Sequence, residues 1–185
     1  GKQAFYDKIP LVDVADVLRF VHEKTGFLSA FTPLQPRYGK KEVDTDNLIA
    51  VLISQGMGFG NHKISQTSDV SYPILEDTYQ QYMRLGNLEK SSTLLADEAS
   101  CLPIFSHYTF DDLQDIFGAL DGQKFEAITP TAKARHSRKY FAKGRGVVAY
   151  TLLSNHIPIQ SELIGAHEHE SYFVFDIWYK NVSLI

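Results

Sequence analysis

The chain has 185 residues, 44% of them hydrophobic and 22% charged, a length that suits one domain with or without a small helical segment before it. The composition is that of an ordinary soluble globular protein. The sequence contains no run of about 18 apolar residues, so no membrane-spanning helix is expected.

Charge is distributed unevenly along the chain. The net charge is −4, yet residues 131–146 carry six Lys or Arg side chains and no acidic one, which leaves −10 for the remainder. A local basic patch matters more for binding nucleic acid than the total charge does. The acidic total therefore does not exclude nucleic acid as a partner.

Cys101 is the single cysteine, which excludes an internal disulfide and a zinc site built from cysteines. Its neighbours are small or apolar, and this pattern favours a buried, inert thiol over a reactive one. A lone reduced cysteine fits a reducing, cytoplasmic setting. The chain begins with Gly1 and shows no signal peptide, so we expect an internal or processed piece of a longer protein.

The first half of the chain predicts helices. Apolar residues recur at helical spacing over 11–21, and Gly26 is placed to end that helix. A second helix is expected after Asp44 or Asp46, either of which can cap its start, and Gly56 can end it.

Glycines are concentrated in the stretch Gln-Gly-Met-Gly-Phe-Gly-Asn at 55–61. It lacks the Lys-Ser/Thr ending of a phosphate-binding loop and follows a helix rather than a strand, so a tight helix-to-helix turn is the favoured interpretation. Further helices are expected from Ile64 to about Ser106, with breaks near Gly86–Asn87 and at Pro103.

After residue 106 the pattern changes to short segments rich in β-branched and aromatic residues. The aromatic-rich segment 170–180 fits a helix packed on a sheet about as well as a strand. We therefore predict an α+β fold, with a mostly helical segment at 1–105 and a strand-containing unit at 106–185. The predicted strands are 124–128, 147–154 and 159–166.

Asp121 is the leading candidate for metal ligation. It follows apolar residues, precedes Gly122, and is expected at a strand end beside the basic run. A carboxylate in that position is what metal-dependent phosphoryl transfer on nucleic acid requires. A hairpin turn, for which Asp-Gly is a common sequence, is the alternative. Competing carboxylates precede it at Asp111, Asp112 and Asp115.

The basic run is a candidate nucleic-acid interface. Its cations could follow phosphates, with Tyr140 and Phe141 as stacking or anchoring groups, although a solvated loop is the usual role of a charged run. The stretch His-Glu-His-Glu at 167–170 offers a His-x-His pair, but a polar turn after the strand is favoured there. The side chains of the basic run are Lys133, Arg135, His136, Arg138, Lys139, Lys143 and Arg145.

These stretches resemble the catalytic region of the Tn3 family of replicative transposases. The chain has Leu-Asp-Gly-Gln-Lys-Phe at 120–125, then Arg135, then Lys-Tyr-Phe-Ala-Lys-Gly-Arg-Gly-Val at 139–147. The family pattern reads Ser-Asp-Gly-Gln-Arg-Phe, then Lys-Tyr-Phe-Gly-Arg-Gly-Arg-Gly-Val, then an aromatic strand ending in Ser-Asp. Residues 148–155 are similar to that strand, and the helix and glycine turn at 49–60 also resemble the family.

The resemblance implies a fold like that of ribonuclease H, with three antiparallel strands, a helix and a fourth strand. It implies an Asp-Asp-Glu triad that binds two Mg²⁺ ions, which activate water for strand nicking and a 3′-hydroxyl for joining. Asp121 matches the first Asp of the triad, and Leu120 replaces the Ser before it. The second Asp would lie beyond Lys180 and the Glu further on, since Asp176 falls in the expected helix.

The resemblance also implies the partners: transposon ends and target DNA, a homodimer in the full-length protein, and no membrane. The bacterial cytoplasm is the expected location, at the nucleoid when bound to DNA. Phosphate contacts are assigned to the basic run on physical grounds, and they carry no sequence information. The residues predicted to bind DNA are Arg135, Arg138, Lys139, Lys143 and Arg145.

Three hypotheses follow. In the first, the chain is an excised part of a complete transposase, and by itself it is expected to be inactive and to bind Mg²⁺ only weakly. In the second, it is a naturally truncated remnant that at most binds DNA or interferes with an intact transposase. The third is a stand-alone nuclease whose site is completed by Glu162 or Asp176.

Overall fold

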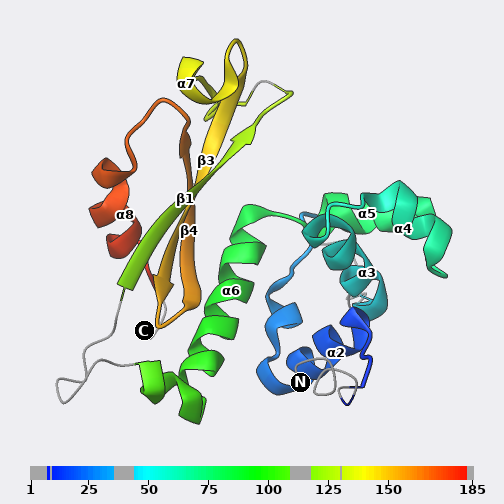
Figure 1. Cartoon of the computed structure of the whole chain (residues 1–185). Helices are drawn as coiled ribbons and strands as arrows, with labels where there is room; N and C mark the ends of the chain where they lie inside the picture. Colours follow the sequence, from blue (N-terminus) through cyan, green and yellow to red (C-terminus); the bar gives the residue numbers. More distant parts are fainter. Residues whose placement is uncertain (1–7, 9, 36–43, 109–117, 130, 183–185) are drawn as a thin grey trace. The chain divides into compact units, whose positions relative to one another are not determined.

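The computed structural model of the protein describes residues 8, 10–35, 44–108, 118–129 and 131–182. The chain divides into two compact units, Gly1–Ser91 and Ser92–Ile185 (Figure 1). Helices form the first unit and an antiparallel sheet forms the second, which confirms the predicted α+β class. The two units meet inside a helix, at Ser91–Ser92. The domain boundary predicted from the sequence, after residue 105, stays a prediction. No helix among the described ranges is long and apolar enough to cross a membrane.

The elements of the first unit are helical. Three-residue-per-turn helices are labelled η. In chain order the elements are α2 (Val14–Thr25), η1 (Phe27–Ala30), α3 (Thr45–Gly56), α4 (Asn61–Thr67), α5 (Tyr72–Tyr82) and α6 (Leu85–Ser100), the last of which continues into the second unit. The second unit adds η2 (Pro103–Tyr108), β1 (Gly118–Glu126), β2 (Arg135–His136), α7 (Arg138–Phe141), β3 (Arg145–Ser154), β4 (Ile157–Gly165), η4 (Glu170–Phe173) and α8 (Val174–Tyr179).

Capping residues set the ends of the first helices: the sequence predicts Gly26 at the end of α2, whereas the cap at Asp13 is seen only in the structure. The carboxylate of Asp13 accepts a hydrogen bond from the Ala15 amide at the start of α2, and Gly26 ends α2 in the left-handed conformation. Of the two candidates for the second helix, Asp44 is the cap, because its carboxylate accepts from the amides of Asp46 and Asn47.

The glycine-rich stretch is a turn between α3 and α4, which confirms the favoured interpretation. Gly58 and Gly60 have φ values of 68° and 78°, which a side chain would disfavour. The buried hydroxyl of Ser54 donates to Oδ1 of Asn61 at 2.8 Å across the turn. The backbone amides of Phe59 and Gly60 both donate to the Ser54 carbonyl oxygen, at 3.0 and 3.2 Å, and so close the turn between the helices.

The predicted break near Gly86–Asn87 lies three residues earlier, at Met83–Arg84. Gly86 and Asn87 are inside the first turn of α6. Asn87 is buried, and its amide nitrogen donates to the carbonyl oxygens of Thr32 and Tyr82 at 2.9 and 2.8 Å. These bonds stabilise the turn before the helix, so glycine chemistry alone placed the break too late.

Cys101 is exposed, and the prediction of a buried thiol is wrong. The residue lies in the turn after α6 ends at Ser100. The apolar neighbours that suggested burial are themselves open to solvent, since Leu102 and Ile104 are 55% and 54% exposed. Apolar neighbours in the sequence indicate burial only where a helix or strand directs their side chains toward the core.

The sheet of the second unit is built around β3. Strand β1 pairs with one edge of β3, and β4 pairs with the other, both antiparallel. The two-residue strand β2 continues the β4 side at the start of β3. The β3–β4 turn is formed by Asn155 and His156, whose φ values of 44° and 69° are those of a two-residue hairpin with a primed turn. Three long strands before a helix agree with the sequence prediction, but the short elements β2 and α7 were not predicted. The first predicted strand, 124–128, is observed as β1 at Gly118–Glu126, because pairing with β3 extends it toward its start.

The two faces of the sheet differ in burial. Along β3 the side chains alternate between buried and half-buried, and the buried set includes Val148, Tyr150 and Leu152. Ile177 of α8 belongs to the same hydrophobic cluster. The ammonium of Lys180, which follows α8, binds Glu162 on this face at 2.6 Å, so α8 covers the buried face. The ambiguous segment 170–180 is thus helical.

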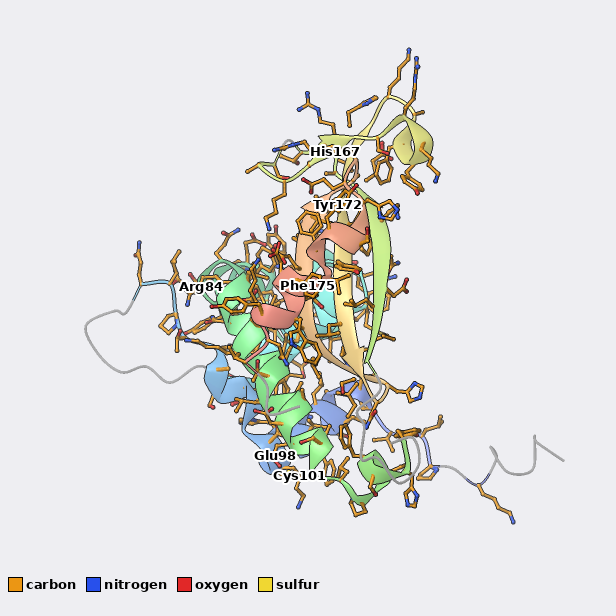
Figure 2. The ribbon with its side chains drawn as sticks, turned by 90° about the vertical axis from the view of Figure 1, so that its left-hand side faces the viewer. Arg84, Glu98, Cys101, His167, Tyr172 and Phe175 are labelled. Carbon is orange, nitrogen blue, oxygen red and sulfur yellow. The ribbon has the colours of Figure 1, made fainter. Side chains whose placement is uncertain are left out.

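Aromatic side chains line the outer side of the segment that covers the sheet. Figure 2 shows Tyr172 and Phe175 on the segment in front of the strands. The exposed fractions of Tyr172, Phe175, Trp178 and Tyr179 are 78%, 83%, 67% and 91%. Exposed apolar side chains in one patch promote association.

The double substitution of Phe175 and Trp178 by Ser is expected to raise the soluble fraction of the purified chain. Stability should change by no more than about 0.5 kcal/mol, because both side chains are exposed. The measurements are sedimentation of aggregates and thermal unfolding followed by circular dichroism. Ile177→Ser on the same helix is the control, and it should cost about 3 kcal/mol or more, since Ile177 is fully buried. Equal aggregation of the double variant and the wild type would contradict the expectation.

Candidate active site and nucleic-acid interface

Asp121 lies inside β1, as the fourth of its nine residues. The register of β1 with β3 is continuous from Gly118 opposite Ser154 to Glu126 opposite Gly146. The prediction that Asp121 ends a strand is therefore wrong, and so is the alternative of a hairpin turn. The Asp-Gly pair suggested a turn, but pairing with β3 keeps this segment extended.

The carboxylate of Asp121 is exposed on the less buried face of the sheet. Its Oδ1 accepts a hydrogen bond from the amide of Gly122 at 2.9 Å. Thr151 lies directly opposite Asp121 on β3, and Ser161 lies opposite Thr151 on β4. Residues paired across strands share a face. The residues directly across the sheet from the carboxylate are therefore small and polar, and Ala149 and Leu153 lie diagonally from it on the same face.

The other carboxylates proposed for a metal site do not join Asp121. Glu162 pairs with Tyr150 and so projects from the opposite face, and Asp176 lies on α8, which covers that face. Among the residues that the structure describes, no three His, Cys, Asp or Glu side chains are grouped to hold a metal ion. Residues 111, 112 and 115 lie outside the described ranges. The hypothesis of a nuclease completed by Glu162 or Asp176 is not supported.

The basic run forms β2, α7 and the loop into β3. The cations of α7 and its loop are exposed, and no ion pair engages them within the described part of the chain. The ammonium groups of Lys139 and Lys124 lie 5.0 and 4.4 Å from the ring centre of Tyr140. Two ammonium groups thus share one exposed aromatic ring, and the choice between a solvated loop and a nucleic-acid interface stays a prediction. The exposed cations are Arg138, Lys139, Lys143 and Arg145.

Arg135, like Lys133, differs from the cations of α7 and its loop, because its side chain bonds to the protein. Its Nη1 donates to the carbonyl oxygens of Ala132 and Ala134 at 2.6 and 3.2 Å. Lys124, in contrast, was not selected from the sequence, although it shares the ring of Tyr140 with Lys139. The family pattern has Arg at that position, so a cation there was a visible signal.

The glycines of the Gly-Arg-Gly motif allow close packing. A side chain at Gly146 would overlap the ring of Phe141 and the carbonyl oxygen of Phe125, and one at Gly144 would overlap the Glu126 carboxylate. The amide of Gly144 also donates to the carbonyl of Phe141 at 2.6 Å. Phe141 therefore anchors the loop against the start of β3.

The basic loop and Asp121 are separated along the sheet. Asp121 pairs with Thr151, whereas the loop meets β3 at Gly146, five residues away, or about 17 Å at the rise of an antiparallel strand. Arg145 lies on the same face as Asp121, because its position has the same parity as Thr151. The basic loop and Asp121 are therefore too far apart to contact the same phosphate group.

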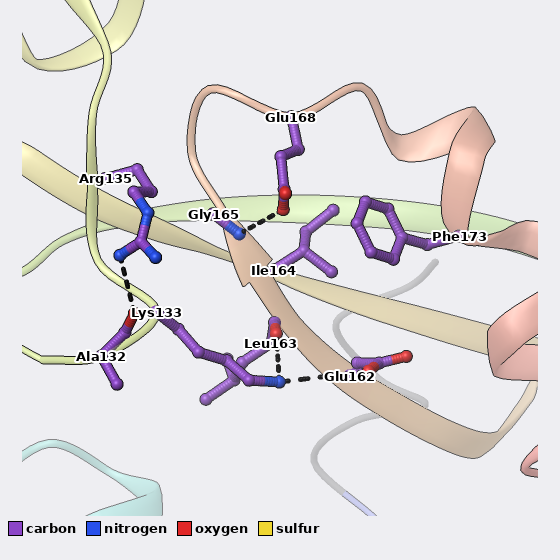
Figure 3. Close-up of a pocket in the computed structure, with 9 residues that line it drawn as sticks. All are labelled: Ala132, Lys133, Arg135, Glu162, Leu163, Ile164, Gly165, Glu168 and Phe173. Atoms are coloured by element: carbon purple, nitrogen blue, oxygen red, sulfur yellow. Dashed lines mark hydrogen bonds and ion pairs between the residues drawn. The ribbon is translucent and has the colours of Figure 1, made fainter.

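A cavity of about 220 Å³ lies at the β4 edge and does not include Asp121 (Figure 3). Lys133 donates to the Leu163 carbonyl at 2.8 Å and lies 4.0 Å from Glu162, and the carboxylate of Glu168 accepts from the Gly165 amide. Oε2 of Glu162 is buried without a partner in the described residues. Most polar groups that line the cavity bind one another. The cavity therefore lies where the loop packs against the sheet, and it offers few free polar groups to a ligand.

The His-Glu-His-Glu stretch is the polar turn that the sequence favours. Glu168 bonds back to the end of β4, and the ring of His169 lies 2.8 Å from the hydroxyl of Ser171 at the start of η4. His169 thus caps a helical turn.

Comparison with known proteins identifies the family to which this chain is similar. A family model described as the Tn3 transposase DDE domain matches residues 16–185. The chain is 22% identical over 173 residues to the transposase for transposon Tn4556 of Streptomyces fradiae, covering 92% of the chain and 19% of the relative. It is 24% identical over 149 residues to the transposase for transposon gamma-delta of Escherichia coli strain K12, covering 80% and 14%. No solved structure matches the chain.

Because the match covers nearly the whole chain, the chain belongs to the DDE class of transposase domains. Within that class the chain belongs to the Tn3 family, as the motifs at 120–125 and 139–147 indicate. The chain spans a fifth or less of the length of the curated relatives that it matches.

Proposed function

We propose that the chain forms part of a DNA transposase that cuts and joins transposon ends by Mg²⁺-dependent phosphoryl transfer in replicative transposition. Asp121 is the first metal-ligating carboxylate of the site. One observation carries the proposal: the Asp of the family motif is exposed on the open face of a sheet, where a DNA phosphate can reach it. The three long antiparallel strands β1, β3 and β4, followed by α8, support a fold like that of ribonuclease H.

The residues present fit part of a magnesium site. Mg²⁺ prefers oxygen ligands, and the exposed carboxylate of Asp121 is such a ligand. The grouped set that a metal needs is incomplete among the described residues. When bound, Mg²⁺ would polarise the phosphoryl group and activate the attacking oxygen. What the chain itself supplies is one negative ligand, held in place by strand pairing on β3.

DNA is the proposed partner, bound as transposon end and as target. The exposed cations of α7 and its loop contact phosphates about 17 Å from Asp121, which corresponds to about five base pairs at 3.4 Å per pair. Contacts of this kind fix the position of the strand without reading its sequence. The protein acts as a homodimer in the bacterial cytoplasm, at the nucleoid when bound to DNA.

The double substitution of Lys139 and Lys143 by Ala is expected to weaken DNA binding for all sequences alike. The slope of the logarithm of the binding constant against that of the salt concentration should fall by about two, since each phosphate contact contributes about 0.9. Fluorescence anisotropy over a salt series measures this slope. Substituting Lys24 and Lys90, exposed lysines of the first unit, should leave it unchanged. An unaltered slope in the Lys139 and Lys143 variant would remove these residues from the interface.

The function is tested with the full-length protein and a plasmid that carries the transposon ends. Nicking and strand-transfer products are expected with Mg²⁺ and not with a chelator. The alternative is a catalytically inactive remnant, which would bind the ends and release no product. The 185-residue chain alone is expected to give no nicking. Nicking by the pure chain would contradict the proposal that the other two carboxylates of the site lie outside it.

A further inference from the structure

Three polar side chains lie in one row across the open face of the sheet. The row starts at Asp121 on β1, continues at Thr151 on β3 and ends at Ser161 on β4. Opposite residues of antiparallel strands have their Cβ atoms about 5 Å apart. Thr151 is thus the nearest cross-strand neighbour of the carboxylate, and Ser161 is one strand further away.

The two hydroxyl groups of the row are bonded to each other. Oγ1 of Thr151 and Oγ of Ser161 are 3.1 Å apart, at a position open to solvent. A hydroxyl group has one proton to donate and two lone pairs. Because only one proton is used within the pair, the other hydroxyl keeps a proton for a third group. If Ser161 donates to Thr151, the free proton is that of Thr151, next to Asp121.

We propose that Thr151 donates a hydrogen bond to a non-bridging oxygen of the DNA phosphate that reacts beside Asp121. Ser161 is a positioning residue, because by donating to Thr151 it directs the Thr151 proton outward. Linked hydroxyls polarise one another, and an anionic oxygen is the stronger acceptor. The inference rests on the proposed function, since it takes Asp121 as the site of phosphoryl transfer.

The chain allows this role to be separated from a structural one. A hydroxyl pair across strands stabilises a sheet only modestly. Thr151→Val keeps the branched shape and the preference for strands, and replaces the hydroxyl by a methyl group. Thr151→Ser restores the hydroxyl on a smaller side chain. Both positions are outside the buried cluster, so the fold should tolerate these changes.

The test measures end cleavage by the full-length transposase with Mg²⁺ under single-turnover conditions. Thr151→Val should slow the step at saturating DNA by about tenfold to a hundredfold, the range for a hydrogen bond to a charged group, with little change in the DNA concentration that gives half the maximal rate. Ser161→Ala should slow it by less than about tenfold, and Thr151→Ser should recover most of the rate. Thermal unfolding and metal-free DNA binding should match the wild type in every variant.

Substrates with sulfur replacing either non-bridging oxygen of the scissile phosphate identify the contact. One of the two isomers should slow the wild type, and it should slow Thr151→Val much less, because the bond is already absent. If Thr151→Val cleaves like the wild type, or if the sulfur effects are simply additive for both isomers, the inference is wrong. Asp121→Asn in the same assay distinguishes failure of the proposed function from failure of the Thr151 contact. If Asp121→Asn still cleaves DNA, the proposed function is wrong. If Asp121→Asn does not cleave and Thr151→Val cleaves normally, only the Thr151 contact is wrong.

Discussion

Asp121→Asn is expected to lower cleavage and joining of transposon ends by at least about a thousandfold in the full-length protein. Losing a residue that merely supports a metal ligand typically costs about tenfold to a hundredfold, so losing a direct ligand should cost more. The amide is nearly isosteric and can still accept the hydrogen bond from Gly122. Because the side chain is exposed, the fold and the binding of transposon ends should be preserved.

Asp176→Asn provides the matched control for this substitution. Asp176 is also an exposed Asp of the second unit, but it lies on α8, on the covered side of the sheet. Its replacement should leave the rate of cleavage unchanged. Gel analysis of nicked and joined products gives the rate, and electrophoretic mobility shift gives end binding. Asp121→Asn with a tenth or more of the wild-type rate would exclude Asp121 as a metal ligand.

Gly146→Ala is expected to destabilise the second unit by about 2 kcal/mol, the middle of the range for overpacking a filled site. The added methyl group would overlap the ring of Phe141 and the carbonyl of Phe125. Relief of this overlap requires Phe141 to move, and Phe141 anchors the loop that carries Lys143. Phosphate binding should therefore weaken together with stability, although no charge has been removed.

Gly118→Ala is the control, at the start of β1. A side chain there would find only the carbonyl oxygen of Leu153, at 3.9 Å, so it fits. An alanine in a strand should be neutral or stabilise by about 0.5 kcal/mol relative to glycine. Chemical denaturation gives the free energy of unfolding of each variant. Equal unfolding of the two variants would show that Phe141 does not need the space above Gly146.

Local chemistry was sufficient to predict the end of α2 and to narrow the start of α3 to two residues. Gly26 and Asp44 act within a few residues of themselves, so their effect can be read from their positions in the sequence. The start of α6 was placed too late because the side chain of Asn87 bonds to Thr32, far away in the sequence. Cys101 was misjudged for a related reason, since burial depends on which elements pack there.

Strand pairing decided what the motifs left open in the candidate site. The family motif selected Asp121, yet the Asp-Gly pair suggested a turn, and only the register with β3 shows an unbroken strand. The same register separates the basic loop from the carboxylate and places Thr151 beside it. Neither relation follows from spacing in the chain, because both depend on how β1 and β3 align across a long connection.

Strand β1, which carries Asp121, is paired along one edge only within the described residues. A further strand docked on its other edge would lie about 4.8 Å away, which is the distance at which two carboxylates can share a cation. Docking of such a strand and binding of the cation would then be thermodynamically coupled, each raising the affinity of the other. In that case the affinity of Asp121 for the cation would depend on whether the further strand is docked. Amide hydrogen exchange along β1 would also slow as the cation is added.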